Sequence, residues 1–289
     1  MKINIDRPLI SVMMPVYNGI LTLPIAIESL IIQTYTNWRC VIVNDGSVDG
    51  TKEYLDSLVD ERFKIIHFDK NKGRPYARQA ALEACEGQYL AYLDADDFYH
   101  PEKLKKQLEV LENNPTVDLI SCGMGSFDSK FELLSVKGKR VHKPTIYRMI
   151  QNYYPARAAC MIRLERAKKI DYNLKLKYAQ DTDYFTRYIN GKKYMVTADI
   201  LYYYSEFTSV NISKVLNTYI HGVNRGISIM GHHFLAGIKL VVLSLLKWCY
   251  ISVKSRFVDH ESFIKSRGQK PSLIEQEDFK EVLKLLNLS

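Results

Sequence analysis

The sequence lacks the features that mark several common classes of protein. Its five cysteines are an odd number and form no Cys-x-x-Cys pair, which excludes a disulfide framework and a cysteine zinc site. Residues 1–8 have neither the apolar core nor the small-residue cleavage site of a secretory signal peptide. We therefore expect buried cysteines and a protein that works in the reducing cytoplasm.

Three further absences argue against particular classes of enzyme and of ligand. The first β-rich run leads into Pro15-Val16-Tyr17-Asn18-Gly19 and not into a glycine-rich phosphate turn, which argues against a dehydrogenase. No serine–histidine or cysteine–histidine arrangement of a catalytic nucleophile is evident. No basic and aromatic motif has the spacing of a nucleic-acid-binding module, so nucleic-acid binding would rest on net charge alone.

Apolar runs of membrane-spanning length are also missing. Residues 226–238 are uncharged, and Lys239 then interrupts the run before a second apolar stretch at 240–246. A spanning helix needs about 20 mostly apolar residues, and a charge near its centre is costly, so a transmembrane span is disfavoured. Basic and apolar residues are interleaved here, which suits either an anionic membrane surface or packing on the main domain or a partner.

The chain does contain basic charge and enough apolar residues for a large core. Its formal net charge is +8, its pI is near 9.0 and 47% of its residues are hydrophobic. The positive balance suits an anionic partner such as a nucleotide diphosphate, nucleic acid or an acidic membrane surface. With 289 residues, we expect one main domain with a C-terminal extension.

The first 120 residues alternate between short β-rich runs and stretches with helical spacing. This rhythm is typical of βαβ units, which build a mostly parallel sheet with helices on both faces. The sequence therefore predicts an α/β fold with a Rossmann-like sheet. The expected strands are 9–15, 40–44, 63–68, 89–93 and 119–122, and the expected helices are 22–33, 51–58, 75–84 and 101–113.

Beyond residue 124 the alternation is looser. After residue 211 we expect helix nearly to the end of the chain, with an interruption at 268–271. Between these points the expected strands are 131–136, 158–164 and one or two over 194–204, and the expected helices are 145–151 and 180–189.

Polar side chains follow each of the first four expected strands. The carboxyl ends of parallel strands are where the connecting loops converge and where ligands bind. Four polar or acidic loops at one edge of the sheet therefore predict a binding site. The loops contain Asn18, then Asn44-Asp45-Gly46-Ser47, then Asn71-Lys72-Gly73-Arg74, and then Asp94-Ala95-Asp96-Asp97.

Asp94 and Asp96 are two residues apart at the end of the fourth expected strand. Side chains two apart in an extended strand project to the same side, so both carboxylates can face one ligand. Close carboxylates repel unless a cation or hydrogen-bond donors relieve them, and oxygen ligands favour Mg²⁺ or Mn²⁺. Such an ion would neutralise charge on a departing diphosphate. The alternative for so short a pattern is a solvated acidic turn.

Asp45 lies directly at the end of the second expected strand. Its carboxylate could accept a hydrogen bond from the imide N–H of a uracil or thymine ring, whereas Ser47 and Asp49 suit an Asx-turn or a helix cap. Arg74 and Arg78 add positive charge where the third helix begins, and they would either contact a phosphate or base or stay solvated.

In this order, the motifs resemble glycosyltransferase family 2. The resemblance covers about residues 9–205, and the ordered run is far more specific than any single motif. It implies the GT-A fold, in which a nucleotide-binding α/β half is fused to an acceptor-binding half. The motifs are SVMMPVYN at 11–18, VNDGSVDGT at 43–51, NKG at 71–73, ARQ at 77–79 and YLDADD at 92–97.

The resemblance also implies roles for residues of this chain. The segment from Pro15 to Asn18 and the carboxylate of Asp45 would hold the base, Asp94 would approach the ribose, and Asp96 would face the metal and the diphosphate. The metal ligands would thus be Asp96 and Asp94. The full expected donor site is Pro15, Val16, Tyr17, Asn18, Asp45, Arg74, Arg78, Asp94, Ala95 and Asp96.

The family places its catalytic base in a Glu-Asp pair that an arginine follows six residues later. This chain has Gln180-Asp181 and then Arg187, so Asp181 aligns with the base, and Asp183 is the fallback. Gln180 departs from the family pattern and removes one neighbouring negative charge. The alternative for both acids is a structural one, because the dipole of a helix favours acids at its N-terminus.

The predicted function is transfer of a hexose or acetamidohexose from a nucleotide-sugar, UDP first among them, to a glycan in surface polysaccharide or lipid-linked oligosaccharide synthesis. One base and one clamp on the leaving group describe a single displacement with inversion. Two alternatives stay open: transfer to polyprenyl phosphate, and a non-catalytic glycan- or membrane-binding protein on the same fold.

The expected organisation has three parts. Residues 1–123 form the nucleotide-sugar-binding half, 124–210 the acceptor-binding half with the candidate base, and 211–289 a helical extension. We expect a cytoplasmic protein. If the helical extension binds an anionic membrane surface, the protein would attach to the inner face of the cell membrane. If the extension packs on the main domain or a partner, it would not.

Overall fold

A computed structural model describes residues 7–139, 143–147, 155–176, 180–206, 212–231, 234–257 and 268–288. The strands are β1 (Ile10–Val16), β2 (Trp38–Asn44), β3 (Phe63–His67), β4 (Tyr89–Tyr92), β5 (Asp97–Tyr99), β6 (Leu119–Phe127), β7 (Leu133–Lys137), β8 (Thr145–Ile146), β9 (Met161–Arg163) and β10 (Lys193–Ser205). The helices are α1 (Leu23–Ile31), α2 (Thr51–Asp56), α3 (Arg74–Ala84), α4 (Lys103–Asn113), α5 (Leu164–Ala167), α6 (Gln180–Ile189), α8 (Ile212–Ile229), α9 (Phe234–Lys254) and α11 (Leu273–Leu285), with a 3₁₀ turn η1 (Arg157–Ala159).

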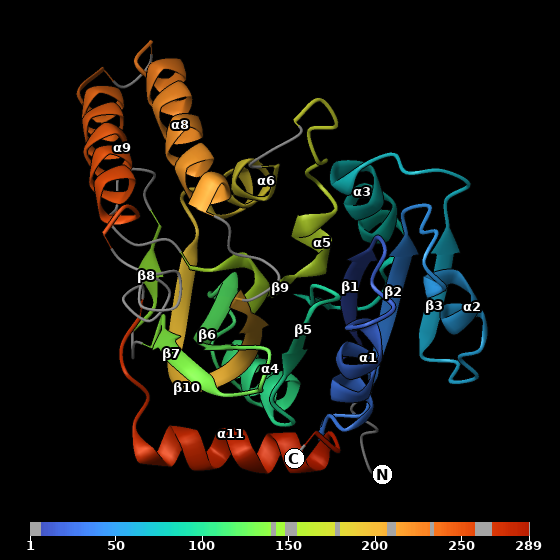
Figure 1. Ribbon diagram of the computed structural model, residues 1–289. Coiled ribbons are helices and arrows are strands. Elements are labelled where there is room, and N and C mark those ends of the chain that lie inside the picture. The colour runs from blue at the N-terminus through green and yellow to red at the C-terminus, as the bar shows by residue number, and fades with distance from the viewer. Residues whose placement is uncertain are drawn as a thin grey trace.

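The strands form one sheet in the order β3-β2-β1-β4-β9-β6-β10-β5, with β7 beside β6 and β8 beside β10 (Figure 1). The first four strands of the chain are parallel, as the βαβ pattern predicts. The second half is mixed, because β9 and β5 run antiparallel to their neighbours while β10 is parallel to β6. The α/β fold class is confirmed, and the parallel arrangement belongs chiefly to the first half.

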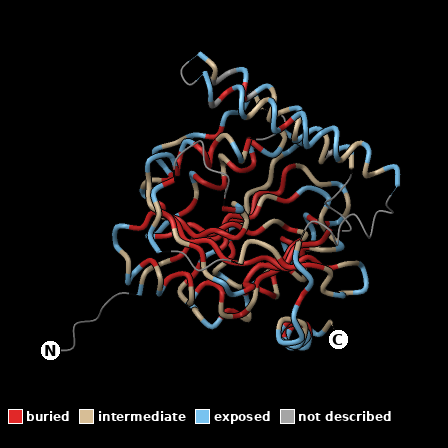
Figure 2. The backbone as a smooth tube through the Cα atoms, turned by 90° about the vertical axis from the view of Figure 1, so that its left-hand side faces the viewer, coloured by how far each residue is buried: buried red, intermediate tan, exposed pale blue. Residues whose placement is uncertain are grey.

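Alternating side chains of the parallel strands enter two cores on opposite faces of the sheet. Val12 and Met14 of β1 pack with apolar residues of α1, α2 and α4. Met13 of β1 and Val43 of β2 pack on the other face with residues of α3, α5 and α6. Figure 2 shows the sheet as a buried layer between more exposed helices. Burial on both faces holds the strand ends in place, so the loops that follow them rest on a fixed frame.

A third core lies under α11, across the second half of the sheet. Phe279 of α11 packs on Phe98 of β5 and Tyr203 of β10, with ring centroids 6.0 Å and 4.8 Å away. The helix begins with a capping box, in which Ser272 and Glu275 each accept a backbone N–H from the other. The predicted helical end of the chain is therefore confirmed here, and it is part of the main body.

Two expected elements differ from the structure. The prediction of a helix at 145–151 is wrong for its described residues, because Thr145–Ile146 form the strand β8 against β10. Tyr147 then exchanges backbone hydrogen bonds with Lys192 and Gly191, and residues 148–151 lie outside the described residues. The strand at 158–164 is shorter than expected, because the 3₁₀ turn η1 precedes it and α5 follows it.

Four of the five cysteines are buried as predicted, whereas Cys249 on α9 is exposed. The three-part division at residues 123 and 210 stays a prediction, and strands on both sides of residue 123 share the sheet. In the part of the chain that is described, no helix is long and apolar enough to cross a membrane.

We predict that Phe279→Ala lowers the free energy of unfolding by about 3–5 kcal/mol, because it leaves a cavity among packed aromatic rings. Leu285→Ala on the same helix is the matched control. That side chain is 56% exposed, so its loss should cost under about 0.5 kcal/mol. Urea unfolding measures both, and equal losses would show that α11 does not anchor this core.

Candidate active site

The predicted donor residues gather around one cavity. It has a volume of about 840 Å³ and lies beyond the carboxyl ends of β1, β2 and β4. All ten residues of the predicted set line it, from Pro15 near the end of β1 to Asp96 in the fourth loop. The structure thus brings together the residues that the sequence placed at one edge of the sheet. That they bind a nucleotide-sugar stays a prediction.

The first two loops are tied to each other by side chains that bind backbone groups. Asn18 has a φ of 51°, a left-handed conformation that asparagine tolerates. Its amide N–H donates to Ser47 Oγ at 2.8 Å, and its own Oδ1 accepts from the Val48 N–H at 2.9 Å. Asp49 and Thr51 accept from the amides of Ile20 and Gly19 in the same way. Ser47 and Asp49 therefore join two loops, and neither is the N-cap residue expected, because Gly50 holds that position in α2.

Asp45 ties the second loop to the third. Its two carboxylate oxygens accept from the backbone N–H groups of Lys72 at 2.7 Å and Gly73 at 2.9 Å, and the residue is buried. The loops approach so closely that a Cβ added at Gly46 would lie 2.4 Å from the carbonyl carbon of Lys70. Gly46 also has a φ of 69°, so only glycine fits this position without strain.

Asp94 and Asp96 belong to a turn and not to an extended strand. β4 ends at Tyr92, and the amide of Asp97 donates to the carbonyl of Asp94 at 3.1 Å. The strand alternation that predicted two carboxylates on one side therefore does not apply. Asp96 lines the cavity, while Asp94 turns its carboxylate toward arginines at the side of the cavity.

Asp97 anchors this turn to the second half of the sheet. Tyr202 donates its hydroxyl proton to Asp97 Oδ2 at 2.6 Å, and the Ser205 amide donates to Oδ1 at 3.1 Å. Burial raises the pKa of the Asp97 carboxyl well above its usual range, and the charges of Asp96 and Asp94 raise it further. The Tyr202 hydroxyl also accepts from the amide of Asp94. The turn is thus held by a strand from the distant half of the chain.

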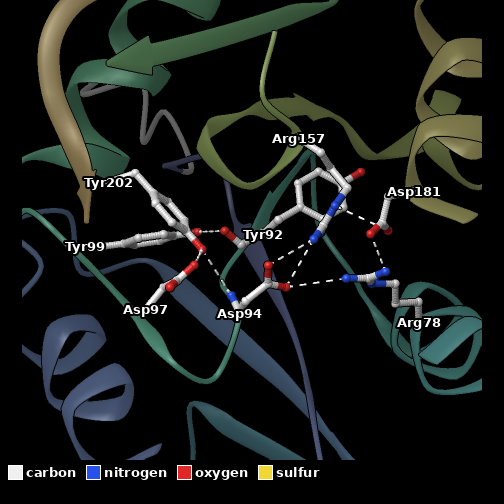
Figure 3. Close-up of polar contacts among 8 residues, drawn as sticks. All are labelled: Arg78, Tyr92, Asp94, Asp97, Tyr99, Arg157, Asp181 and Tyr202. Atoms are coloured by element: carbon white, nitrogen blue, oxygen red, sulfur yellow. Dashed lines mark hydrogen bonds and ion pairs between the residues drawn. The ribbon is translucent and has the colours of Figure 1, made fainter. Parts of the chain in front are cut away.

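Two arginines whose side chains are only 4% and 9% exposed, Arg78 and Arg157, connect Asp94 with Asp181, the predicted base (Figure 3). Arg157 Nη2 lies 3.1 Å and 3.2 Å from the two Asp94 oxygens, and its Nε lies 3.3 Å from Asp181 Oδ1. Arg78 Nη1 donates a hydrogen bond to Asp181 Oδ2, and Arg78 Nη2 lies 3.5 Å from Asp94 Oδ1. Two carboxylates and two guanidinium groups therefore form one cluster between the cavity and α6.

The cluster has a marked electrostatic effect on Asp94. Burial alone would raise the pKa of this carboxyl, but the neighbouring charges of Arg157 and Arg78 lower it to about 2. Arg157 also lies over the ring of Tyr92, with its Cζ 5.1 Å from the ring centroid. Asp94 is therefore held ionised beside the cavity across the physiological pH range.

Arg157 was not predicted as a site residue, and no local signal in the sequence marks it. Its partner Asp94 is 63 residues away along the chain, and the arginine stands alone in an apolar segment. Only the folded chain brings η1 against β4 and α6.

The two candidate bases on α6 face different surroundings. Asp181 joins the arginine cluster, and although it does not itself line the cavity, it contacts Arg78, which does. Asp183 pairs with Arg187 on the exposed side of the helix, with Asp183 Oδ2 2.7 Å from Arg187 Nη2. The geometry favours Asp181 over Asp183.

The acids near the cavity fit a divalent cation only in part. Asp94 already faces two guanidinium groups, which is not the environment of a metal ligand, so its predicted metal role is not supported. Across the described residues no group of three or more histidines, cysteines or acids could hold a metal ion. A Mg²⁺ site often uses only one or two carboxylates together with substrate phosphates. Asp96 at the cavity fits that kind of site.

The sequence matches the family model described as Glycosyl transferase family 2 over residues 11–167. A putative teichuronic acid biosynthesis glycosyltransferase of Bacillus subtilis is 38% identical over 107 residues, which are 36% of this chain and 42% of that protein. An uncharacterized glycosyltransferase of Methanocaldococcus jannaschii is 31% identical over 215 residues, which are 70% of this chain and 72% of that protein. The chain thus spans less than half of the first relative's length.

The fold also matches a solved structure. S. aureus TarS 1–349 in complex with UDP-GlcNAc superposes with a TM-score of 0.63 at 20% identity, over 96% of this chain and 80% of that chain. At this identity the match concerns the fold, and it confirms the GT-A architecture.

We predict that Arg157→Gln lowers the free energy of unfolding by about 2–3 kcal/mol at pH 7, because it leaves two carboxylates, only 31% and 28% exposed, with one cation. Arg187→Gln is the matched control, since its pair with Asp183 is exposed and should contribute at most about 1 kcal/mol. Urea unfolding measures both variants.

The same prediction has a pH dependence. The pKa of Asp94 is lowered in the folded protein, so its contribution to stability is present above the unfolded pKa of about 4 and is lost as the pH falls toward 2. The difference between the protein and Arg157→Gln should therefore shrink between these values. A difference that stays constant over this range would contradict an ionic origin.

Proposed function

The chain belongs to glycosyltransferase family 2, and from this premise we propose that it moves a sugar from a nucleotide-sugar in the cavity to a glycan acceptor. The observation that carries the proposal is the shared cavity: ten residues chosen from sequence motifs line one space of about 840 Å³. That volume is within the usual range of small-molecule sites. The proposed donor is a UDP-sugar, and the proposed acceptor is a surface polysaccharide or a lipid-linked glycan. The B. subtilis relative is named for teichuronic acid biosynthesis, which agrees with such an acceptor.

The base of the donor would bind between the first and second loops. Each Asp45 oxygen accepts one backbone N–H, and a carboxylate oxygen has a second lone pair that can accept from the imide of a uracil ring. Tyr17 is half exposed at the cavity and offers a ring for stacking. A buried carboxylate fixed by two backbone donors is a rigid acceptor, which supports recognition of a base that carries an N–H.

The diphosphate would lie near the start of α3 and the fourth loop. α3 begins at Arg74, so the positive end of the helix dipole and the Arg74 side chain put positive charge at the cavity wall. A Mg²⁺ or Mn²⁺ ion bound at Asp96 would add positive charge against the negative charge of the leaving diphosphate. Asp94 would keep the side chains of Arg78 and Arg157 in place beside the diphosphate.

Asp181 is the proposed base. The Arg78 and Arg157 guanidinium groups orient its carboxylate toward the donor side of the molecule, where it would take the proton of an acceptor hydroxyl during attack. One base opposite one leaving group supports a single displacement with inversion. A phosphate acceptor would need no such base, so transfer to polyprenyl phosphate is the second candidate.

A donor screen tests the proposal directly. UDP-, GDP- and dTDP-sugars would be incubated with the protein, with and without Mn²⁺, and release of nucleoside diphosphate would be measured. We expect release from a UDP-sugar that depends on the cation. No release from any donor, with no binding of UDP by calorimetry, would leave the non-catalytic alternative.

We predict that Asp96→Ala lowers UDP release by about 100-fold, because a loss of about 3 kcal/mol of charge stabilisation has this effect on a rate. The fold should be retained, since this acid lies at the cavity surface and adds little to the core. Glu61→Ala, at an exposed acid away from the cavity, is the control. Full release by Asp96→Ala would remove the proposed metal role.

We predict that Asp181→Asn lowers transfer to a hydroxyl acceptor by about 10²–10⁴-fold, the usual contribution of a positioned base, while UDP affinity stays the same. Asp183→Asn on the same helix is the matched control and should keep nearly full activity. Unchanged transfer to the hydroxyl acceptor would show that Asp181 is not the base, whereas turnover with a polyprenyl phosphate acceptor alone would favour the second candidate.

A further inference from the structure

The helices α8 and α9 form a hairpin that projects from the sheet (Figures 1 and 2). Small residues let the two helices approach closely. A Cβ added at Gly222 would lie 2.5 Å from Ser244 Oγ, and one added at Gly226 would lie 2.6 Å from a side-chain carbon of Val241. Small residues therefore fill part of the contact between the helices, and several large apolar side chains of α9 are left to face outward.

The outward face of α9 carries an apolar stripe, which we define as Leu235, Val242, Leu246 and Val253. These positions are seven, four and seven residues apart, so they lie on one side of the helix. Their exposed fractions are 80%, 47%, 61% and 57%. Side chains of this size rarely form a continuous exposed row unless something covers it.

Positive charge lies along the apolar stripe. Lys239, Lys247 and Lys254 are eight and seven residues apart, so they form a second row on the flank of the same helix. The sequence from 212 to 257 contains six lysines and arginines and no aspartate or glutamate. A partner of this surface must therefore accept apolar side chains and bring negative charge.

We propose that α9 lies on an anionic lipid surface, with the apolar stripe among the acyl chains and the lysines at the lipid phosphates. Long lysine side chains can bury their carbon stems and keep the charged group at the phosphate level. A second copy of this chain is a poorer occupant, because it would bring two acid-free, basic hairpins face to face. The inference concerns binding alone and does not rest on the proposed transferase activity.

Vesicle flotation of the full chain tests this. One vesicle would contain phosphatidylcholine alone, and the other would also contain phosphatidylglycerol. We expect at least about tenfold stronger binding to the anionic vesicle, and weaker binding at high salt. Leu246→Glu should lower anionic binding at least about tenfold. Val59→Glu, at a side chain that is 95% exposed far from α9 in the sequence, is the matched control and should change nothing.

The charged row has its own variant. Lys239→Gln with Lys247→Gln should lower anionic binding by about 30-fold, since each lysine near such a surface contributes about fivefold. Equal binding to both vesicles, or binding to neither, would overturn the proposal. A dimer in light scattering that Leu246→Glu dissociates, without vesicle binding, would assign the stripe to a second copy instead.

Failure of this inference can be told apart from failure of the proposed function. α9 supplies no residue to the cavity, so Leu246→Glu should keep wild-type UDP release in vesicle-free buffer. A chain that binds anionic vesicles but releases no UDP would overturn the transferase alone. Circular dichroism of Leu246→Glu checks that the hairpin stays helical, and the lysine variant keeps the test independent of the apolar substitution.

Discussion

The site depends on one buried ion cluster, in which Arg157 and Arg78 stand between Asp94 and Asp181. Guanidinium groups with so little exposure are stable only if carboxylates surround them, and each carboxylate here would repel the other without them. The cluster joins a turn after β4 to a helix nearly ninety residues later in the chain. It therefore fixes the distance between the cavity and the proposed base before any ligand binds, which is the kind of pre-organisation that catalysis needs.

Much of the site was accessible from the sequence because strand ends in a parallel sheet meet at one edge. Asp45, Arg74 and Asp96 are far apart in the chain, yet each follows or precedes an element whose direction the βαβ rhythm fixes. Arg157 was not accessible in this way, because its position follows from how η1 packs on β4, and such packing leaves no periodic trace. The short segment at residue 145 failed for a related reason: a two-residue strand is decided by its neighbour β10 and not by its own side chains.

The geometry also changes the interpretation of the VNDGSVDGT motif at residues 43–51. Asp45, Ser47 and Asp49 each accept from the backbone of a neighbouring loop, and Asn44 accepts from the Ser47 N–H within its own loop, so the motif first of all fixes the shape of the loops around the cavity. For Asp94, by contrast, its motif predicted a ligand contact that the structure does not support. Its spacing to Asp96 suggested a shared ligand, but the turn separates the two acids and gives them different neighbours. A motif thus predicts where the chemistry is gathered more securely than which atom performs it.

The loops around the cavity contain few positions at which a residue can be substituted without disturbing their hydrogen bonds. Asp45, Gly46 and Ser47 are all committed to holding loops together, so replacing any of them would disturb the others. Tyr17 and Leu21 also line the cavity, but they are 51% and 89% exposed, and no hydrogen bond to a described residue restrains their side chains. Evolution or a protein engineer could exchange these two without loosening the frame. Diversity of donors within such a scaffold would then arise from its first loop, while the remaining three stay unchanged.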